Sequence, residues 1–134
     1  MTSTLSASLG VSSDHALAGI LIPSLFRLFE EWGLTGQQQM VLLGLQNEKT
    51  LYNWKRQPEK AKLGRDTVER ASYLLGIYKA LDLLLPAPGL AKQWLHTAND
   101  HPLFNHTPPI QRLLAGHVVD LYVVRAHLDE ATHQ

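Results

Sequence analysis

The sequence of 134 residues contains no cysteine. This absence excludes a disulfide scaffold, zinc sites built on cysteine and a thiol nucleophile. No apolar run approaches the roughly 20 residues that a membrane-spanning helix needs. Residues 1–10 also lack the Lys or Arg with which a secretory signal begins. We therefore expect a cytoplasmic protein that does not enter a membrane.

An excess of charge of either sign is also missing. Twelve Lys and Arg residues balance twelve Asp and Glu residues, and 18% of the chain is charged against 45% hydrophobic. The balance excludes a uniformly basic nucleic-acid binder, and the composition suits one globular domain or at most two small ones. The distribution is uneven, because residues 46–65 carry six cations and two anions, whereas residues 81–134 carry three cations and five anions.

Apolar periodicity and capping signals predict helices in the first half of the chain. Residues 1–14 are rich in Ser, Thr and small residues and are expected to be mobile, as part of a flexible leader over residues 1–23. An apolar stripe over residues 25–32 begins the first helix. A capping box at residues 35–38 starts a second, short helix, and Asn47 is the predicted N-cap of a third.

A second capping box, at residues 66–69, predicts the longest helix, which continues to about Leu84. This helix is apolar on several sides, so it should run through the centre of the fold or form an oligomer interface. Further helices are expected around Trp94, after Pro108 and over residues 118–130. The last segment has strand propensity, but its pattern continues in helical fashion and no partner strand is available. The predicted fold class is all-α.

Two short helices joined around Gly44 have the pattern of a helix-turn-helix. If Leu51 and Trp54 point inward, one outward face collects polar side chains that can read base edges or contact phosphate. Exposed Lys, Asn and Arg are also ordinary solvated surface. The predicted DNA-binding residues are Lys49, Tyr52, Asn53, Lys55 and Arg56. A single copy would bind weakly, so a homodimer formed through the long apolar helix is expected.

Motifs in the second half of the chain resemble a known family. Residues 94–99 (WLHTAN), followed by Leu-Phe at 103–104, Pro-Pro at 108–109, LLAG at 113–116 and a Val-rich helix to Leu128, resemble the Xre/MbcA/ParS toxin-binding domain. Upstream, Leu-Gly at 43–44, Tyr-Asn-Trp at 52–54 and the segment 70–80 look like the Xre-type helix-turn-helix that precedes it. The resemblance covers roughly residues 24 to 130.

The resemblance implies an antitoxin of a type II toxin–antitoxin pair. Its partner would be a toxin with the RES fold, which consumes NAD or uses it to ADP-ribosylate a protein. The antitoxin would have no catalytic role and no cofactor, and its helix-turn-helix would bind operator DNA and repress its own operon. The implied division is a leader over residues 1–23, a DNA-binding and dimerisation region over 24–85, and a toxin-binding domain with a C-terminal tail over 86–134.

The tail of residues 129–134 is polar and acidic. In such families the C-terminal domain and tail cover the toxin's NAD pocket, and an acidic tail suits a pocket that binds phosphates with cations. The competing interpretation is a frayed tail, with an arginine docking the toxin. Trp94 is either a core residue or a contact residue. The predicted toxin-binding residues are Trp94, Arg112, Arg125, Asp129, Glu130, His133 and Gln134.

Other function classes have less support. His96, His101 and His106 recur every five residues, which is not the spacing of a helical zinc site. No nucleophile elbow and no Gly-rich phosphate loop is present, so nothing indicates an enzyme. A stand-alone helix-turn-helix regulator with a C-terminal oligomerisation module would explain the first half only. A protein-binding module that has lost DNA binding would explain the second half only.

Overall fold

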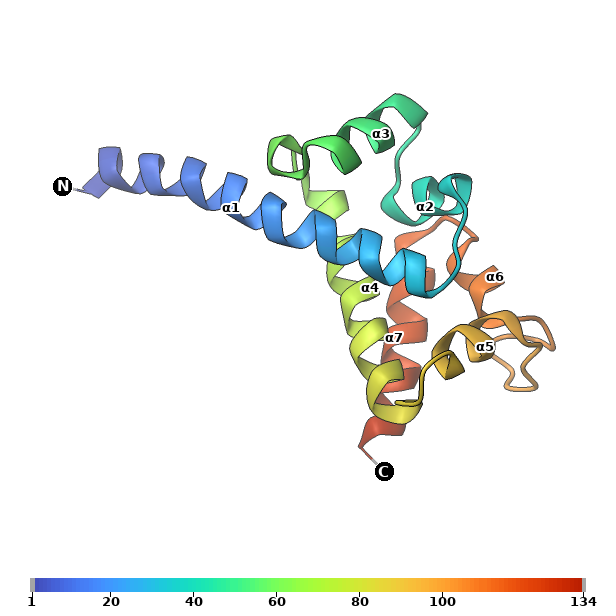
Figure 1. The fold of residues 1–134 in the computed structure, drawn as a ribbon. Helices are drawn as coiled ribbons and strands as arrows, with labels where there is room; N and C mark the ends of the chain where they lie inside the picture. The colour runs from blue at the N-terminus through green and yellow to red at the C-terminus, as the bar shows by residue number, and fades with distance from the viewer. Residues whose placement is uncertain (1, 134) are drawn as a thin grey trace.

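A computed structural model describes residues 2–133 of the chain, with side chains from His15 onward. This part folds into seven α-helices and one short 3₁₀ helix and contains no strand (Figure 1), which confirms the all-α prediction. The elements are α1 Thr2–Glu31, α2 Gly36–Leu43, α3 Glu48–Arg56, η1 Pro58–Lys60, α4 Arg65–Leu84, α5 Leu90–His96, α6 Pro109–Leu113 and α7 Val118–Thr132. None of the helices described is both long and apolar enough to cross a membrane.

Helix α4 lies at the centre, as its apolar composition predicts. It packs against α7 along its length, and α1 crosses it on another side (Figure 1). The buried side chains of α4 include Leu74, Ile77 and Leu81, each at most 1% exposed. Val68, Leu83 and Leu84 of the same helix stay 36–65% exposed, and the dimer interface expected on α4 stays a prediction.

Helix α1 does not begin after Pro23, as the sequence pattern predicts, but runs through it. Ala18 and Ile22 are fully buried, so the end of the predicted leader is part of the core. Pro23 lacks the N–H that would bond the Gly19 carbonyl, and burial of the neighbouring turns keeps the helix continuous in spite of that loss. Residues 1–14 are predicted to be mobile, and their side chains lie outside the part of the chain whose side chains the structure describes.

The predicted caps of the helix-turn-helix are present. The Thr35 hydroxyl accepts from the Gln38 N–H at 3.2 Å, and the Gln38 side chain accepts from the Thr35 N–H at 2.9 Å. The Asn47 side chain accepts from the Lys49 N–H at 2.7 Å. The capping box predicted at residues 66–69 is wrong, because the N-cap of α4 is Gly64, two residues before Asp66, and it makes no side-chain bond.

Asp66 instead belongs to a network centred on Arg70, a residue only 9% exposed. The Arg70 guanidinium donates to the Asp66 carboxylate at 2.9 Å, to the Val41 carbonyl at 3.4 Å and to the Gly116 carbonyl at 3.1 Å. Gly44, at φ +71°, ends α2 beside this network, and a Cβ there would lie 2.8 Å from the Arg70 Nε. Arg70 therefore joins the end of α2, the start of α4 and the loop before α7.

Candidate nucleic-acid interface

The helix-turn-helix consists of α2, a turn and α3. Gly44 ends α2 in the left-handed conformation, and Asn47 starts α3 three residues later. Leu51 and Trp54 are 5% and 8% exposed and face the core, as predicted. The inner face of α3 is thus fixed by two large apolar side chains, which turns its polar side chains to solvent.

The outer face of α3 carries Lys49, Tyr52, Asn53 and Arg56, and all four are exposed. Tyr52 is 63% exposed, and the Arg56 guanidinium lies 5.8 Å from the centre of its ring. This cation–π contact orients both side chains outward. The structure therefore brings these four predicted residues together on one face, and DNA binding by them stays a prediction.

Lys55 does not share that face, contrary to the sequence analysis. Its ammonium group lies 5.2 Å from the centre of the Phe26 ring in α1. Lys55 follows Trp54 directly, so it occupies the flank of α3 that turns toward α1. Lys55 was predicted among the outward residues because of its charge, and not because of its position along the helix.

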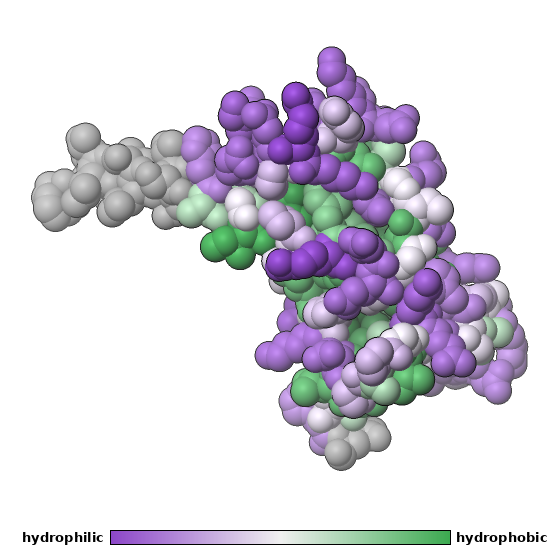
Figure 2. All heavy atoms as spheres, in the orientation of Figure 1, coloured by the Kyte–Doolittle hydropathy of each residue, from purple (hydrophilic) through white to green (hydrophobic). Residues whose placement is uncertain are grey.

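Two lysines beyond α3 extend the outward face, and the sequence analysis did not select them. Lys60 and Lys62 line a concavity beside α3 together with Thr50, Asn53, Trp54, Arg56 and Gln57. We call Lys49, Asn53, Arg56, Lys60 and Lys62 the basic face. Within residues 15–133, none of its cations takes part in an ion pair. Figure 2 shows hydrophilic side chains gathered over this end of the molecule.

The charge count over residues 46–65 was the sequence signal for Lys60 and Lys62, but it could not place them. Helical periodicity ends with α3 at Arg56, and the chain then turns through η1. η1 packs against α1, where the Cβ of Glu59 would lie 3.7 Å from a Cβ at Gly19. This tertiary contact brings the two lysines back beside Asn53.

Two short helices joined by a tight turn, with a cationic outer face on the second, define the class of helix-turn-helix proteins. In this class the second helix lies in the major groove of DNA. The sequence profile of the antitoxin Xre-like helix-turn-helix domain matches residues 4–76, and the chain belongs to this family. The match includes nearly all of α1. An uncharacterized protein of Sinorhizobium fredii, y4oB, is 36% identical over 118 residues, which is 88% of each chain.

Trp94, a predicted toxin-binding residue, lies half-buried in α5. Its ring meets the Phe104 ring edge to face, with centroids 5.6 Å apart and an interplanar angle of 89°. The other side of the ring lines a groove at the C-terminal end of α4, which we call the apolar groove. The groove is formed by Leu85, Leu90, Gln93, Trp94, Thr97, Ala98 and Asn99. Leu90 is 38% exposed within the groove, and Leu83, which is 65% exposed, adds apolar surface at the same end of α4.

Arg112, a second predicted toxin-binding residue, is engaged within the chain. Its Nε donates to the Asp120 carboxylate at 2.6 Å, and Asp120 is only 7% exposed. Its NH1 donates to the Leu103 carbonyl at 3.2 Å. Arg112 therefore holds the loop before α6 against the start of α7, and its role in toxin binding stays a prediction.

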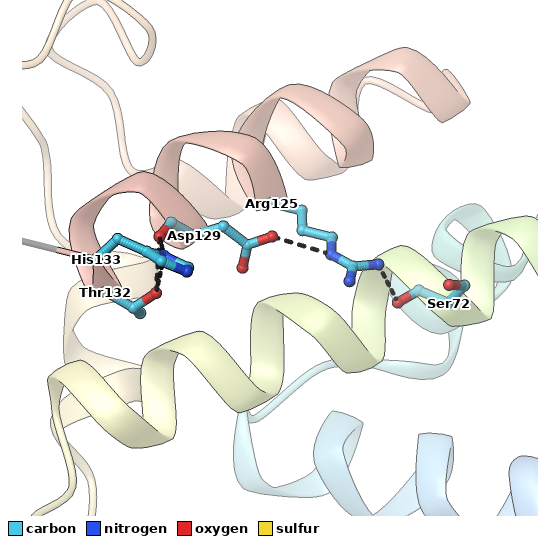
Figure 3. A network of polar contacts seen from close by, with 5 residues as sticks. All are labelled: Ser72, Arg125, Asp129, Thr132 and His133. Carbon is cyan, nitrogen blue, oxygen red and sulfur yellow. Dashed lines mark hydrogen bonds and ion pairs between the residues drawn. The ribbon is translucent and has the colours of Figure 1, made fainter.

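Arg125 and Asp129 form a network on the seam between α7 and α4 (Figure 3). Arg125 donates to the Asp129 carboxylate and to the Ser72 carbonyl, both at 3.3 Å. The guanidinium lies against Gly76, where any side chain would collide with it. The ion pair is partly exposed, so both residues remain accessible to a partner.

Most of the acidic tail predicted over residues 129–134 belongs to α7. α7 continues to Thr132, so Asp129 and Glu130 lie in its final turns. The Thr132 hydroxyl donates to the Asp129 carbonyl at 2.7 Å, and the His133 Nδ1 lies 2.7 Å from the same oxygen (Figure 3). The structure thus extends the helix predicted over residues 118–130 by two residues, and these hydrogen bonds hold its last turn. Gln134 lies outside the described residues.

The histidines are dispersed. The His96 Nε2 lies 2.8 Å from the Trp32 carbonyl oxygen, which fixes α5 on the end of α1. The His101 and His127 rings are tilted at 49° to each other with centroids 4.3 Å apart, next to Phe104. Among the residues that the structure describes, no three His, Asp or Glu side chains meet as a metal site requires.

The His127 environment predicts a loss of stability in acid. Burial, and secondarily the neighbouring His101, lower the pKa of His127 below its usual 6.5, while Glu130 opposes them. The unfolded chain then binds a proton more readily than the folded chain, so stability is full above about pH 6.5 and falls as the pH drops through the lowered pKa. We expect Tm to decrease between pH 7.5 and pH 5, with a flatter profile for His127→Gln. An unchanged profile for His127→Gln, alongside His15→Gln as control, would refute this assignment.

Proposed function

We propose that this chain is the antitoxin of a type II toxin–antitoxin pair, which neutralises a RES-fold toxin and represses its own operon as a homodimer. The toxin would hydrolyse or phosphorolyse NAD, or transfer its ADP-ribose to a protein. Membership of the antitoxin Xre-like family supports the proposal. The observation that carries it is the separation of two surfaces: the basic face lies at the N-terminal end of α4 and the apolar groove at its C-terminal end (Figure 1).

The basic face supplies the chemistry for operator binding. Asn53 and Lys49 project from the middle and start of α3, where side chains of this class reach base edges, and an Asn pairs bidentately with adenine. Arg56, Lys60 and Lys62 lie along one side of α3 and suit phosphate contacts, which position the protein without reading sequence. Binding should therefore weaken steeply as salt rises.

The apolar groove supplies the chemistry for a protein partner. It combines an aromatic ring with aliphatic and amide side chains, the composition that is enriched at the centre of protein interfaces. The end of α7, with Asp129 and Glu130, lies at the same end of the molecule (Figure 1). A toxin seated on the groove would meet these carboxylates, which suit a pocket that binds NAD phosphates through cations.

A groove variant tests partner binding. Leu90 lines the groove and is 38% exposed, so Leu90→Glu puts a charge into the contact without removing a core side chain. We expect the affinity for the product of the adjacent gene to fall by at least about 100-fold, measured by calorimetry on the purified proteins. Val119→Glu, at an exposed position of α7 outside the groove, is the matched control and should bind as wild type does.

Equal binding by Leu90→Glu and wild type would show that the toxin docks elsewhere. If the wild-type chain binds its operator and the adjacent gene's product does not bind at all, the stand-alone regulator becomes the better account. Deleting residues 129–134 removes Asp129 and Glu130 but keeps the apolar groove, so it tests these two parts of the toxin-binding surface separately. We expect the shortened chain still to bind the toxin and to lose neutralisation.

A further inference from the structure

Phe104 connects the apolar groove with a pair of histidines. Its side chain is only 2% exposed. Three rings surround it, with centroid distances of 5.6 Å to Trp94, 6.2 Å to His101 and 5.8 Å to His127. We call these four residues the aromatic cluster. Because Trp94 also lines the groove, a displacement of Phe104 removes the support behind one wall of the groove.

The His101 ring holds the loop of residues 97–108, between α5 and α6, only while the ring is neutral. The Leu103 N–H donates to the His101 Nδ1 at 3.1 Å. Nδ1 therefore carries no proton, and the single proton of the neutral ring lies on Nε2. A second proton goes to Nδ1 and breaks this hydrogen bond. Leu103 directly precedes Phe104, so the break frees the backbone next to the centre of the aromatic cluster.

The neighbouring His127 gives a second reason why this pair stays neutral in the folded chain. The centroids of the two rings are 4.3 Å apart, a distance at which two positive charges repel each other. Burial, and secondarily His101, lower the pKa of His127, and Glu130 from the next turn of α7 opposes them. A proton on either ring therefore works against the arrangement that the structure shows.

The loop that carries His101 contains a strained turn. Asn105 and His106 have φ values of +49° and +65°, in the left-handed region that residues other than glycine rarely adopt. Such a turn persists only while its surroundings hold it. The other charged groups at the loop already have partners: Asp100 lies 3.3 Å from the His106 Nδ1, and Arg112 donates to the Leu103 carbonyl at 3.2 Å. The turn is therefore poised to relax once the Leu103 N–H loses its acceptor.

We infer that His101 and His127 form a proton-sensitive switch, which keeps Phe104 against Trp94 while both rings are neutral and releases it in acid. The groove is the proposed toxin site, so an effect on toxin binding rests on the proposed function. Protons and toxin then favour different conformations of the loop, and each weakens the binding of the other. The affinity for the toxin should be full above about pH 7 and decrease as the histidines become protonated.

Proton-induced loss of the contact is measurable without any partner. Nuclear Overhauser cross-peaks between the Trp94 and Phe104 ring protons report the contact directly. We expect them in the wild-type chain at pH 7.5 and their loss at pH 5.5. His101→Asn keeps an acceptor at the place of Nδ1 but takes up no proton, so it should retain the cross-peaks at both values. Far-UV circular dichroism checks that the chain keeps its helices at pH 5.5.

The same variants test the effect on the toxin. By calorimetry, we expect the Kd of the wild-type chain for the adjacent gene's product to be at least about threefold higher at pH 5.5 than at pH 7.5. His101→Asn should remove most of this change, whereas protonation of the toxin itself affects all variants alike. His101→Lys, which carries a fixed charge and no acceptor, should bind at pH 7.5 as weakly as the wild-type chain at pH 5.5.

His106→Asn is the matched control, because His106 is exposed in the same loop and Asn tolerates its positive φ. It should keep the wild-type pH dependence in both measurements. Cross-peaks that persist in the wild-type chain at pH 5.5 would overturn the switch, as would a pH dependence that His101→Asn keeps or that His106→Asn removes. If the cross-peaks respond as expected and the adjacent gene's product binds at neither pH, the switch stands and the proposed function fails.

Discussion

Replacing Lys49, Asn53 and Arg56 together by Ala should lower the affinity for the operator by at least about 100-fold. The three side chains share the outer face of α3, and none of them supports the core. A single bidentate base contact contributes about 1–3 kcal/mol of discrimination, and lost phosphate contacts add to it. A gel-shift or fluorescence-anisotropy titration with the DNA upstream of the gene measures the loss.

Two controls distinguish base reading from general loss of charge. The double variant Lys79→Ala, Lys92→Ala removes two cations from exposed positions outside the basic face and should bind nearly as wild type does. Lys60→Ala with Lys62→Ala should weaken binding to all sequences alike and reduce the slope of log affinity against log salt by about two. If the α3 variant binds the operator as tightly as wild type, α3 does not contact the DNA.

Replacing Arg70 by Met should be among the most destabilising single changes outside the apolar core. The guanidinium serves the Asp66 carboxylate and the carbonyls of Val41 and Gly116 from a position that is 9% exposed. Met fills similar space but leaves both carbonyls without this donor, at a cost of about 2–3 kcal/mol. For a chain of this size the loss lowers Tm by about 10 °C, which calorimetry would detect.

Arg65→Met is the matched control, because Arg65 is exposed at the start of the same helix. Its effect should stay within about 0.5 kcal/mol. Arg70→Lys keeps the charge without the planar fork, so it should fall between wild type and Arg70→Met. A Tm for Arg70→Met that equals that of Arg65→Met would show that the network adds no stability.

The parts of the fold that depend on local chemistry were predictable from the sequence. The Thr35 and Asn47 caps and the inward face of α3 rest on hydrogen bonds and periodicity within a few residues, and the structure shows them as predicted. The central position of α4 followed from its apolar composition. The last segment, over residues 118–130, has strand propensity but forms a helix, as its apolar pattern through Leu128 predicts.

The features that depend on contacts between distant segments were not predictable. Pro23 signals a helix boundary, but burial of Ile22 overrides it. Asp66 has the sequence of an N-cap, but the Arg70 guanidinium engages its carboxylate. Lys60 and Lys62 reach the basic face only because η1 packs on α1. Such outcomes depend on which segments meet in space, and local sequence does not encode that.

Expression of the adjacent gene, with and without this chain, tests the central claim most directly. Growth and cellular NAD are followed after induction in a bacterium. The antitoxin account predicts that the neighbour's product alone stops growth and that this chain restores it. If the toxin consumes NAD, the cellular NAD concentration should decrease as growth stops. If the toxin ADP-ribosylates a protein, growth should stop without a loss of NAD. A harmless neighbour, or growth arrest that this chain does not relieve, would contradict the account.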